Sequence, residues 1–258
     1  MNTKKNNKKY HLISILSVIS FLAIWELCTD ILHLAPTHSL PSFITVAKQL
    51  IIKFYTKAPD GATLLTHIWS SLKIALVGFV AGTIVGVPLG ILTGWYKKFD
   101  MVFKPIFDII RPIPPISWIP IMILFLGIGV GAKSGVIFLS AVIPTIINSY
   151  AGIKQTKAVH LWVAQTFGAT NLQMLFRVAI PTALPMIFTG LKVSLGAAWM
   201  TLVAAELLAS NSGLGYMIQY ARSIGRADII LVGMIVMAVI GSALAGLLEL
   251  IEKRIVRG

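Results

Sequence analysis

Long apolar stretches separated by short polar segments constrain this chain more than any other feature. Six such stretches lie at about Leu12–Thr29, Ser71–Tyr96, Pro105–Gly127, Ser134–Ala151, Leu184–Leu208 and Ile229–Leu250. Each is close to the roughly 20 apolar residues that a helix needs to cross a bilayer. Only 12% of the 258 residues are charged, against about 25% in a soluble domain. The sequence therefore predicts an all-α, polytopic membrane helix bundle with six transmembrane helices.

Basic side chains lie mostly between these stretches, where they determine orientation across the membrane. Placing both termini in the cytoplasm puts thirteen Lys and Arg residues inside and six outside. Lys73, Arg111 and Lys192 lie near the ends of apolar stretches, and we expect their side chains to snorkel toward the interface. The formal net charge of +13 thus indicates topology and contact with anionic lipid rather than nucleic-acid binding.

The N-terminal region allows two interpretations. Four lysines before the first apolar stretch resemble the start of a signal peptide. The stretch is long and no clean cleavage site follows it, which favours an uncleaved span. We expect residues 1–66 to hold this span and an amphipathic surface helix at Phe43–Tyr55. Residues 67–252 would then form the core, and residues 253–258 a cytoplasmic tail.

Glycine and proline patterns distinguish the second and third stretches. Glycines four residues apart follow one helix face, at Gly78, Gly82, Gly86, Gly90 and Gly94. Small residues let a second helix approach closely in lipid, so we expect helix packing there. The third stretch holds five prolines, at Pro105, Pro112, Pro114, Pro115 and Pro120, which break a helix. The bend serves either shape alone or a transport pathway, for which Pro115 and Trp118 are candidates.

Glu206 is a carboxylate near the outer end of the fifth stretch, where a charge is costly. It is a candidate for the pathway or the outer gate, together with Trp199 of the same stretch. The alternative is an interfacial residue that a basic side chain or backbone donors hold in place. The turn-rich segment 211–215 that follows predicts a re-entrant or surface loop on the outer side.

The segment 153–181 is too polar for the bilayer centre and too apolar for a flexible, solvent-exposed loop. It predicts a short helix at Ala158–Phe167, with Gly168 as its C-cap residue. Several apolar side chains there need a surface to bury against: Trp162, Val163, Phe167, Leu172, Leu175 and Phe176. We expect either a docking helix for a soluble cytoplasmic partner or a helix that lies flat on the membrane.

Residues for several kinds of chemistry are missing from the sequence. Gly127–Ser134 nearly spells a phosphate-binding P-loop, but Ala132 stands where glycine is required. No hydrolytic triad, metal cluster or paired-carboxylate site can be read from the sequence, and Cys28 is the single cysteine. We therefore expect no catalytic residue, metal or cofactor in this chain, and we do not expect an enzyme.

The segment 153–181 resembles the signature loop of the permease subunits of bacterial ABC importers of the type I fold. That signature reads E-A-A, three residues, G, nine residues, I-x-L-P. Matching positions are Ala164, Gly168, Val178, Ile180 and Pro181, whereas Trp162 replaces the Glu and Val163 the first Ala. The resemblance implies an ATPase-coupling loop that includes Trp162, Val163, Ala164, Phe167, Gly168, Ala169 and Pro181.

A second stretch is similar to the nitrate/sulfonate/taurine branch of these permeases. Its residues are Arg111-Pro112-Ile113-Pro114-Pro115, followed by Trp118-Ile119-Pro120. The likeness extends over about residues 65–252 and implies import of a small organic anion such as an alkanesulfonate or taurine. Nitrate, bicarbonate and a pyrimidine precursor of thiamine remain alternatives. An ion-gradient-driven transporter or a channel would be expected to show internal repeats or a buried charge relay, which we do not find.

The resemblance also implies partners and a location. A second permease copy would complete a homodimer, two cytoplasmic ATPase subunits would carry the ATP and Mg, and an extracytoplasmic solute-binding protein would deliver the solute. The short helix at Ala158–Phe167 would sit in a groove of each ATPase. The location implied is the bacterial inner membrane, as a multi-pass protein with both termini cytoplasmic.

Overall fold

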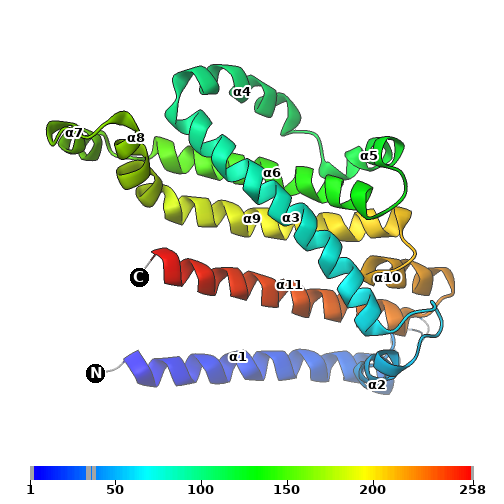
Figure 1. Cartoon of the computed structure of the whole chain (residues 1–258). Coiled ribbons are helices and arrows are strands. Elements are labelled where there is room, and N and C mark those ends of the chain that lie inside the picture. The colour runs from blue at the N-terminus through cyan, green and yellow to red at the C-terminus, as the bar shows by residue number, and fades with distance from the viewer. Residues whose placement is uncertain (1–2, 33–35, 37–38, 257–258) are drawn as a thin grey trace. The chain divides into compact units, whose positions relative to one another are not determined.

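The computed structural model describes the chain apart from residues 1–2, 33–35, 37–38 and 257–258, and it leaves out the side chains of 3–12, 14, 208 and 209. The described residues form helices and connections without any strand, which confirms the predicted all-α class (Figure 1). In chain order the elements are α1 (Thr3–Glu26), η1 (Leu27–Ile31), α2 (Phe43–Tyr55), α3 (Leu64–Trp95), α4 (Lys97–Ile110), η2 (Pro115–Trp118), α5 (Ile119–Leu126), α6 (Val130–Lys154), α7 (Ala158–Thr166), α8 (Asn171–Met174), η3 (Leu175–Ala179), α9 (Ile180–Ala209), α10 (Leu214–Ser223) and α11 (Ala227–Val256).

The chain forms two compact units. The first contains residues 1–67 and 217–236, and the second contains residues 68–216 and 237–258. The second unit holds the predicted coupling loop and most of the apolar helices.

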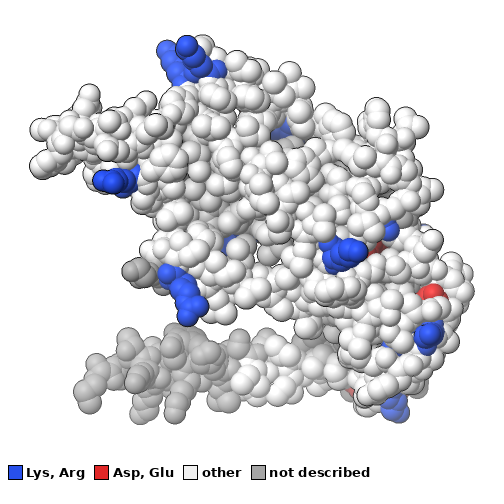
Figure 2. Space-filling model, in the orientation of Figure 1, with Lys and Arg blue, Asp and Glu red and all other residues white. Residues whose placement is uncertain are grey.

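Four described helical segments are long and apolar enough to cross a membrane: Leu64–Trp95, Val130–Lys154, Asn171–Leu207 and Ala227–Val256. A fifth crossing is possible at the proline-rich segment, where Lys97–Ile110 and Pro115–Leu126 meet at an angle of 91°. The surface drawn in Figure 2 is largely uncharged, as lipid contact requires, with basic side chains in small separate groups. The count of six spans stays a prediction.

The glycine face of α3 packs against α6, as the sequence predicted. A Cβ atom added at Gly78 would lie 2.6 Å from Ile137 Cβ, and one added at Gly90 would lie 2.6 Å from the Ile146 carbonyl oxygen. Gly82, Gly86 and Gly94 meet α6 at similarly short distances. Because only a hydrogen atom fits at these positions, the two backbones touch along most of their length.

The same contacts show that α3 and α6 run in the same direction. Gly78 meets Ile137, Gly86 meets Thr145 and Gly94 meets Ile153, so the two helices advance together. Two parallel crossings require that the chain between them returns across the membrane. The bent pair α4 and η2–α5 is therefore interpreted as one broken span. The predicted break falls at Pro112, Pro114 and Pro115, whereas Pro105 lies inside α4 and does not interrupt it.

In the first unit, a buried ion cluster holds the turn between α2 and α3. Lys53 is fully buried, and its Nζ lies 2.5 Å from Asp60 Oδ1. The same ammonium group donates to the carbonyl oxygens of Ala58 and Ala62, and His67 Nε2 lies 3.4 Å from the other oxygen of Asp60. The helix α2 has the predicted bounds, and the ion cluster removes the Lys53 ammonium group from solvent.

We predict that Gly90→Val destabilises the protein by about 1–3 kcal/mol, because the new side chain would overlap the α6 backbone. The measurement is thermal unfolding of the detergent-solubilised protein. The matched control is Gly246→Val in α11, where an added Cβ meets nothing within 4 Å. Equal losses in both variants would contradict the packing role of the glycine face.

Candidate functional site

The short helix α7 lies at one end of α6 and α9, next to α8 (Figure 1). It ends in a Schellman motif: the Gly168 N–H donates to the Gln165 carbonyl at 2.9 Å and the Ala169 N–H to the Ala164 carbonyl at 3.0 Å. Gly168 has a φ of 76°, a conformation that glycine adopts without steric cost. The predicted helix is confirmed, but it ends one residue earlier, at Thr166, so that Phe167 is the C-cap residue and Gly168 follows it.

Apolar side chains of this loop point into open space. Trp162 is 64% exposed and Phe167 is 87% exposed. Val159, Val163, Leu172 and Phe176 are exposed as well. Clustered apolar surface of this kind marks a site of contact with a protein or a membrane. Leu175, in contrast, is buried rather than available to a partner.

The base of the loop is anchored in the second unit. Leu175 and Ala179 of η3 pack in a buried cluster with Ile153 of α6 and Ala183 of α9. Trp95 Nε1, at the end of α3, donates to Asn171 Oδ1 at 3.0 Å. Thr170 and Gln173 form a capping box at the start of α8, and Pro181 lies in the first turn of α9. An exposed tip therefore stands on a base that contacts α3, α6 and α9.

Glu206 is buried and fully engaged in hydrogen bonds. Ser71 Oγ lies 2.7 and 2.8 Å from its two carboxylate oxygens, and the Gly215 N–H donates to Oε2 at 2.8 Å. Ser71 Oγ in turn accepts from the Leu214 N–H at 2.8 Å. Gly213 has a φ of 126°, and a Cβ atom there would overlap the Glu206 carboxylate. The carboxylate thus ties the start of α10 to α3.

This arrangement corrects one sequence interpretation and adds a residue. The segment 211–215 is a loop only as far as Gly213, because α10 begins at Leu214. Sequence reasoning missed Ser71, since a serine at the start of an apolar stretch is unremarkable until its partner is known. Two further contacts hold the turn: Lys133 Nζ donates to Ser210 Oγ at 2.7 Å, and the Ser70 and Ser212 hydroxyls lie 2.9 Å apart.

The other residues predicted to line the pathway lie either at a cavity beside η2 or between α9 and α11. Pro115 lines a cavity, and Trp118 is half-buried in the same turn of 3-10 helix. Trp199 Nε1 donates to the Met237 carbonyl at 3.2 Å, and its ring contacts Gly241, so this side chain joins α9 to α11. A pathway role for Pro115, Trp118, Trp199 or Glu206 stays a prediction.

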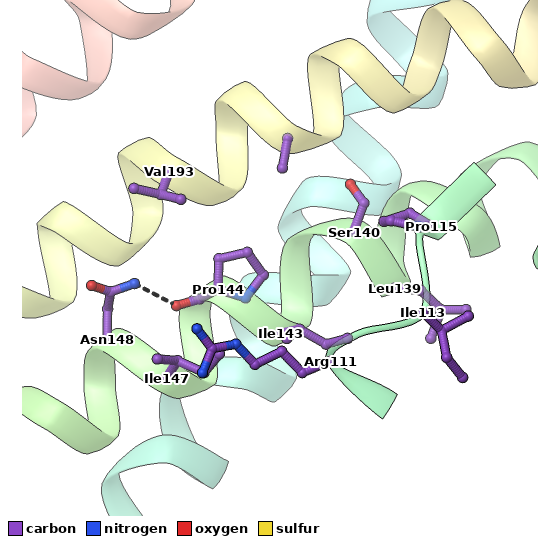
Figure 3. Close-up of a pocket in the computed structure, with 11 residues that line it drawn as sticks. Arg111, Ile113, Pro115, Leu139, Ser140, Ile143, Pro144, Ile147, Asn148 and Val193 are labelled. Atoms are coloured by element: carbon purple, nitrogen blue, oxygen red, sulfur yellow. Dashed lines mark hydrogen bonds between the residues drawn. The ribbon is translucent and has the colours of Figure 1, made fainter. Parts of the chain in front are cut away.

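The cavity beside Pro115 has a volume of about 350 Å³ and lies between the α4–η2 turn, α6 and α9 (Figure 3). Its polar lining consists of Arg111, Ser140 and Asn148, and the rest is apolar. A second cavity of about 270 Å³ shares Arg111 and Ile147 with the first. From the sequence, Arg111 was expected to snorkel and to belong to the family-like proline stretch, and neither Ser140 nor Asn148 was singled out.

Comparison with known proteins identifies relatives over nearly the whole chain. The taurine transport system permease protein of Escherichia coli is 36% identical over 219 residues, which is 83% of this chain and 80% of that protein. A Bacillus subtilis permease named for aliphatic sulfonates transport is 32% identical and covers 92% of this chain and 83% of its own length. The nitrate import permease protein of Synechocystis is 30% identical, covering 93% and 87%.

A solved structure has a similar fold. A chain of the MetNI methionine ABC transporter, in an inward-facing conformation, superposes with a TM-score of 0.63, covering 75% of this chain and 94% of that chain at 21% identity. The family model described as "Binding-protein-dependent transport system inner membrane component" matches residues 86–257, which include the predicted coupling loop, the cavity and Glu206. The chain therefore belongs to this family, the membrane-embedded permeases of binding-protein-dependent ABC importers.

Proposed function

We propose that this chain is the permease subunit of an ATP-driven importer for a small organic anion such as an alkanesulfonate or taurine. The similarity to permeases named for taurine and for aliphatic sulfonates supports this substrate class. Two copies would form the pathway, with two ATPase subunits in the cytoplasm and a solute-binding protein outside. ATP hydrolysis would take place in the ATPase subunits, so this chain would not act as an enzyme by itself.

The observation that carries the proposal is the exposed apolar tip of α7 on an anchored base. Trp162 and Phe167 expose large apolar surface, which a groove of an ATPase subunit would cover. The alternative to a docking helix is a helix that lies flat on the membrane. Such a helix would not need a loop base that contacts α3, α6 and α9. In the family signature a glutamate occupies the position of Trp162, so an apolar contact would here replace a polar one.

Coupling would follow from this anchoring. When ATP binding closes the ATPase subunits, α7 would move with them, and the η3 cluster of Leu175 and Ala179 would pass that movement to α6 and α9. The hydrogen bond between Trp95 and Asn171 would extend the movement to α3. The pathway would then switch between inward-open and outward-open arrangements as a population shift.

The orientation of the chain follows from the same proposal. If α7 contacts cytoplasmic ATPases, both termini lie in the cytoplasm and the protein resides in the bacterial inner membrane. Glu206 and the 210–213 turn then lie at the outer end of α9, where the binding protein would dock. A role for Glu206 in the outer gate would act through its contacts with Ser71 and Gly215.

The relative named for nitrate import favours a second candidate substrate. Nitrate and an alkanesulfonate are both oxyanions, so the same importer mechanism would serve either one. Bicarbonate and a pyrimidine precursor of thiamine have no such support among the relatives described above.

We predict that Trp162→Ala weakens binding of the purified permease to its ATPase subunit by about tenfold or more, since buried aromatic anchors dominate interface energies. Surface plasmon resonance on nanodisc-embedded permease measures the affinity. The matched control is Leu247→Ala in α11, which is 56% exposed in the isolated chain. If Trp162→Ala binds the ATPase as tightly as the control does, α7 is not the docking helix.

We predict that the solute-binding protein encoded beside this permease binds taurine or a longer alkanesulfonate more tightly than nitrate, bicarbonate or the aminopyrimidine precursor of thiamine. Isothermal titration calorimetry with this panel measures the preference. A tight sulfonate signal supports the proposed substrate class. Binding only to nitrate transfers the proposal to the second candidate, and binding only to the aminopyrimidine overturns the anion assignment.

A further inference from the structure

The cavity beside Pro115 contains an arginine without a carboxylate partner. Among the described residues, no Asp or Glu lies within 4.0 Å of the Arg111 guanidinium, and the nearby Asp108 pairs with Lys104 at 3.2 Å. Arg111 is exposed in the isolated chain, and it caps α4 within the bent pair that we interpret as one broken span. An ionised side chain within a membrane segment usually faces a water-filled cavity or a bound ion. In Figure 3 the guanidinium extends along α6 toward Asn148.

Two polar side chains of α6, Ser140 and Asn148, add hydrogen-bonding groups to the cavity beside Arg111. Ser140 is 2% exposed, and its hydroxyl has no hydrogen-bond partner in the described part of the chain. Pro144 lies inside α6 and lacks the N–H that would bind the Ser140 carbonyl, so the helix is locally open at this point. Asn148 donates one N–H to the Pro144 carbonyl at 2.8 Å, and its second N–H and its oxygen make no hydrogen bond within the described part of the chain.

The remaining lining is apolar. It comes from Ile113, Pro115, Leu139, Ile143, Ile147 and Val193, with Ala197 and the ring of Pro144. A volume of about 350 Å³ is at the small end of the range for ligand sites. The cavity thus combines the Arg111 guanidinium, two hydrogen-bonding side chains and an apolar wall. This combination suits a small solute with an oxyanion head and a short alkyl part.

We propose that this cavity is a solute site within the permease, in which Arg111 binds the oxyanion head, Asn148 donates a hydrogen bond to it, and the buried Ser140 hydroxyl turns toward it when the solute binds. The guanidinium is permanently charged, and its planar N–H groups fit two oxygens of a sulfonate or nitrate at once. This inference rests on the proposed function: the permease would recognise the anion a second time, after the binding protein has released it. The solute-binding protein and the permease would then both contribute to substrate specificity.

The first experiment measures binding of radiolabelled ethanesulfonate to purified permease in nanodiscs of phosphatidylcholine. Arg111→Met lowers the affinity at least about tenfold, because it removes a charge-assisted, two-point contact. Arg111→Lys, which retains the charge but not the fork, has a smaller effect, and Ser140→Ala also weakens binding. The matched control, Arg254→Met, removes an exposed arginine of α11 that does not line the cavity. Unchanged binding in Arg111→Met overturns the site.

A phospholipid headgroup is the other source of an oxyanion. Mass spectrometry of lipid that co-purifies with the permease separates the two sources. If Arg111→Met loses bound anionic lipid and retains ethanesulfonate binding, Arg111 anchors a headgroup and the proposal is wrong. If lipid content is unchanged and ethanesulfonate binding falls, the proposal holds.

Uptake by cells that carry each variant as the only copy separates this inference from the proposed function. Wild-type uptake of sulfonate with a large loss in Arg111→Met supports both. Normal uptake in Arg111→Met overturns the site and leaves the importer in place. Absence of sulfonate and nitrate uptake in wild-type cells overturns the proposed function, and the site falls with it.

Discussion

Close contact between α3 and α6 is the constraint on which the second unit depends. Five glycines allow the two backbones to touch, and their partners advance in step, so the helices run parallel. A parallel pair forces the intervening chain to cross back, and the prolines of that segment make the crossing a broken one. The break creates the cavity at the α4–η2 turn, where Arg111 and Pro115 face α6 and α9.

The ends of this bundle are fixed in two different ways. At one end the loop around α7 is anchored by the apolar η3 cluster and by the bond between Trp95 and Asn171, while its tip stays exposed. At the other, the buried carboxylate of Glu206 joins α10 to α3 through Ser71. A buried, satisfied carboxylate rigidifies its surroundings. The proposed mechanism needs such stiffness, because a movement at α7 must reach the pathway without being absorbed.

Much of this architecture could be predicted from the sequence, because its signals are local. Apolar length predicted the membrane helices, glycine spacing predicted the packed face of α3, and Gly168 predicted the end of α7. Contacts between distant polar residues could not be predicted. The pairing of Ser71 with Glu206 and the burial of Lys53 by Asp60 depend on tertiary geometry. The cavity of Arg111, Ser140 and Asn148 combines residues from separate helices, none of which stands out alone.

Photo-crosslinking from position 162 would show whether α7 docks on an ATPase subunit, the contact on which coupling depends. A benzophenone amino acid would replace Trp162, an exposed residue of the α7 tip, in cells that contain the intact transporter. If α7 docks there, position 162 cross-links to the ATPase subunit, and the same probe at position 247 does not. Cross-links from position 162 to lipid alone would mean that α7 lies flat on the membrane and does not dock on the ATPase.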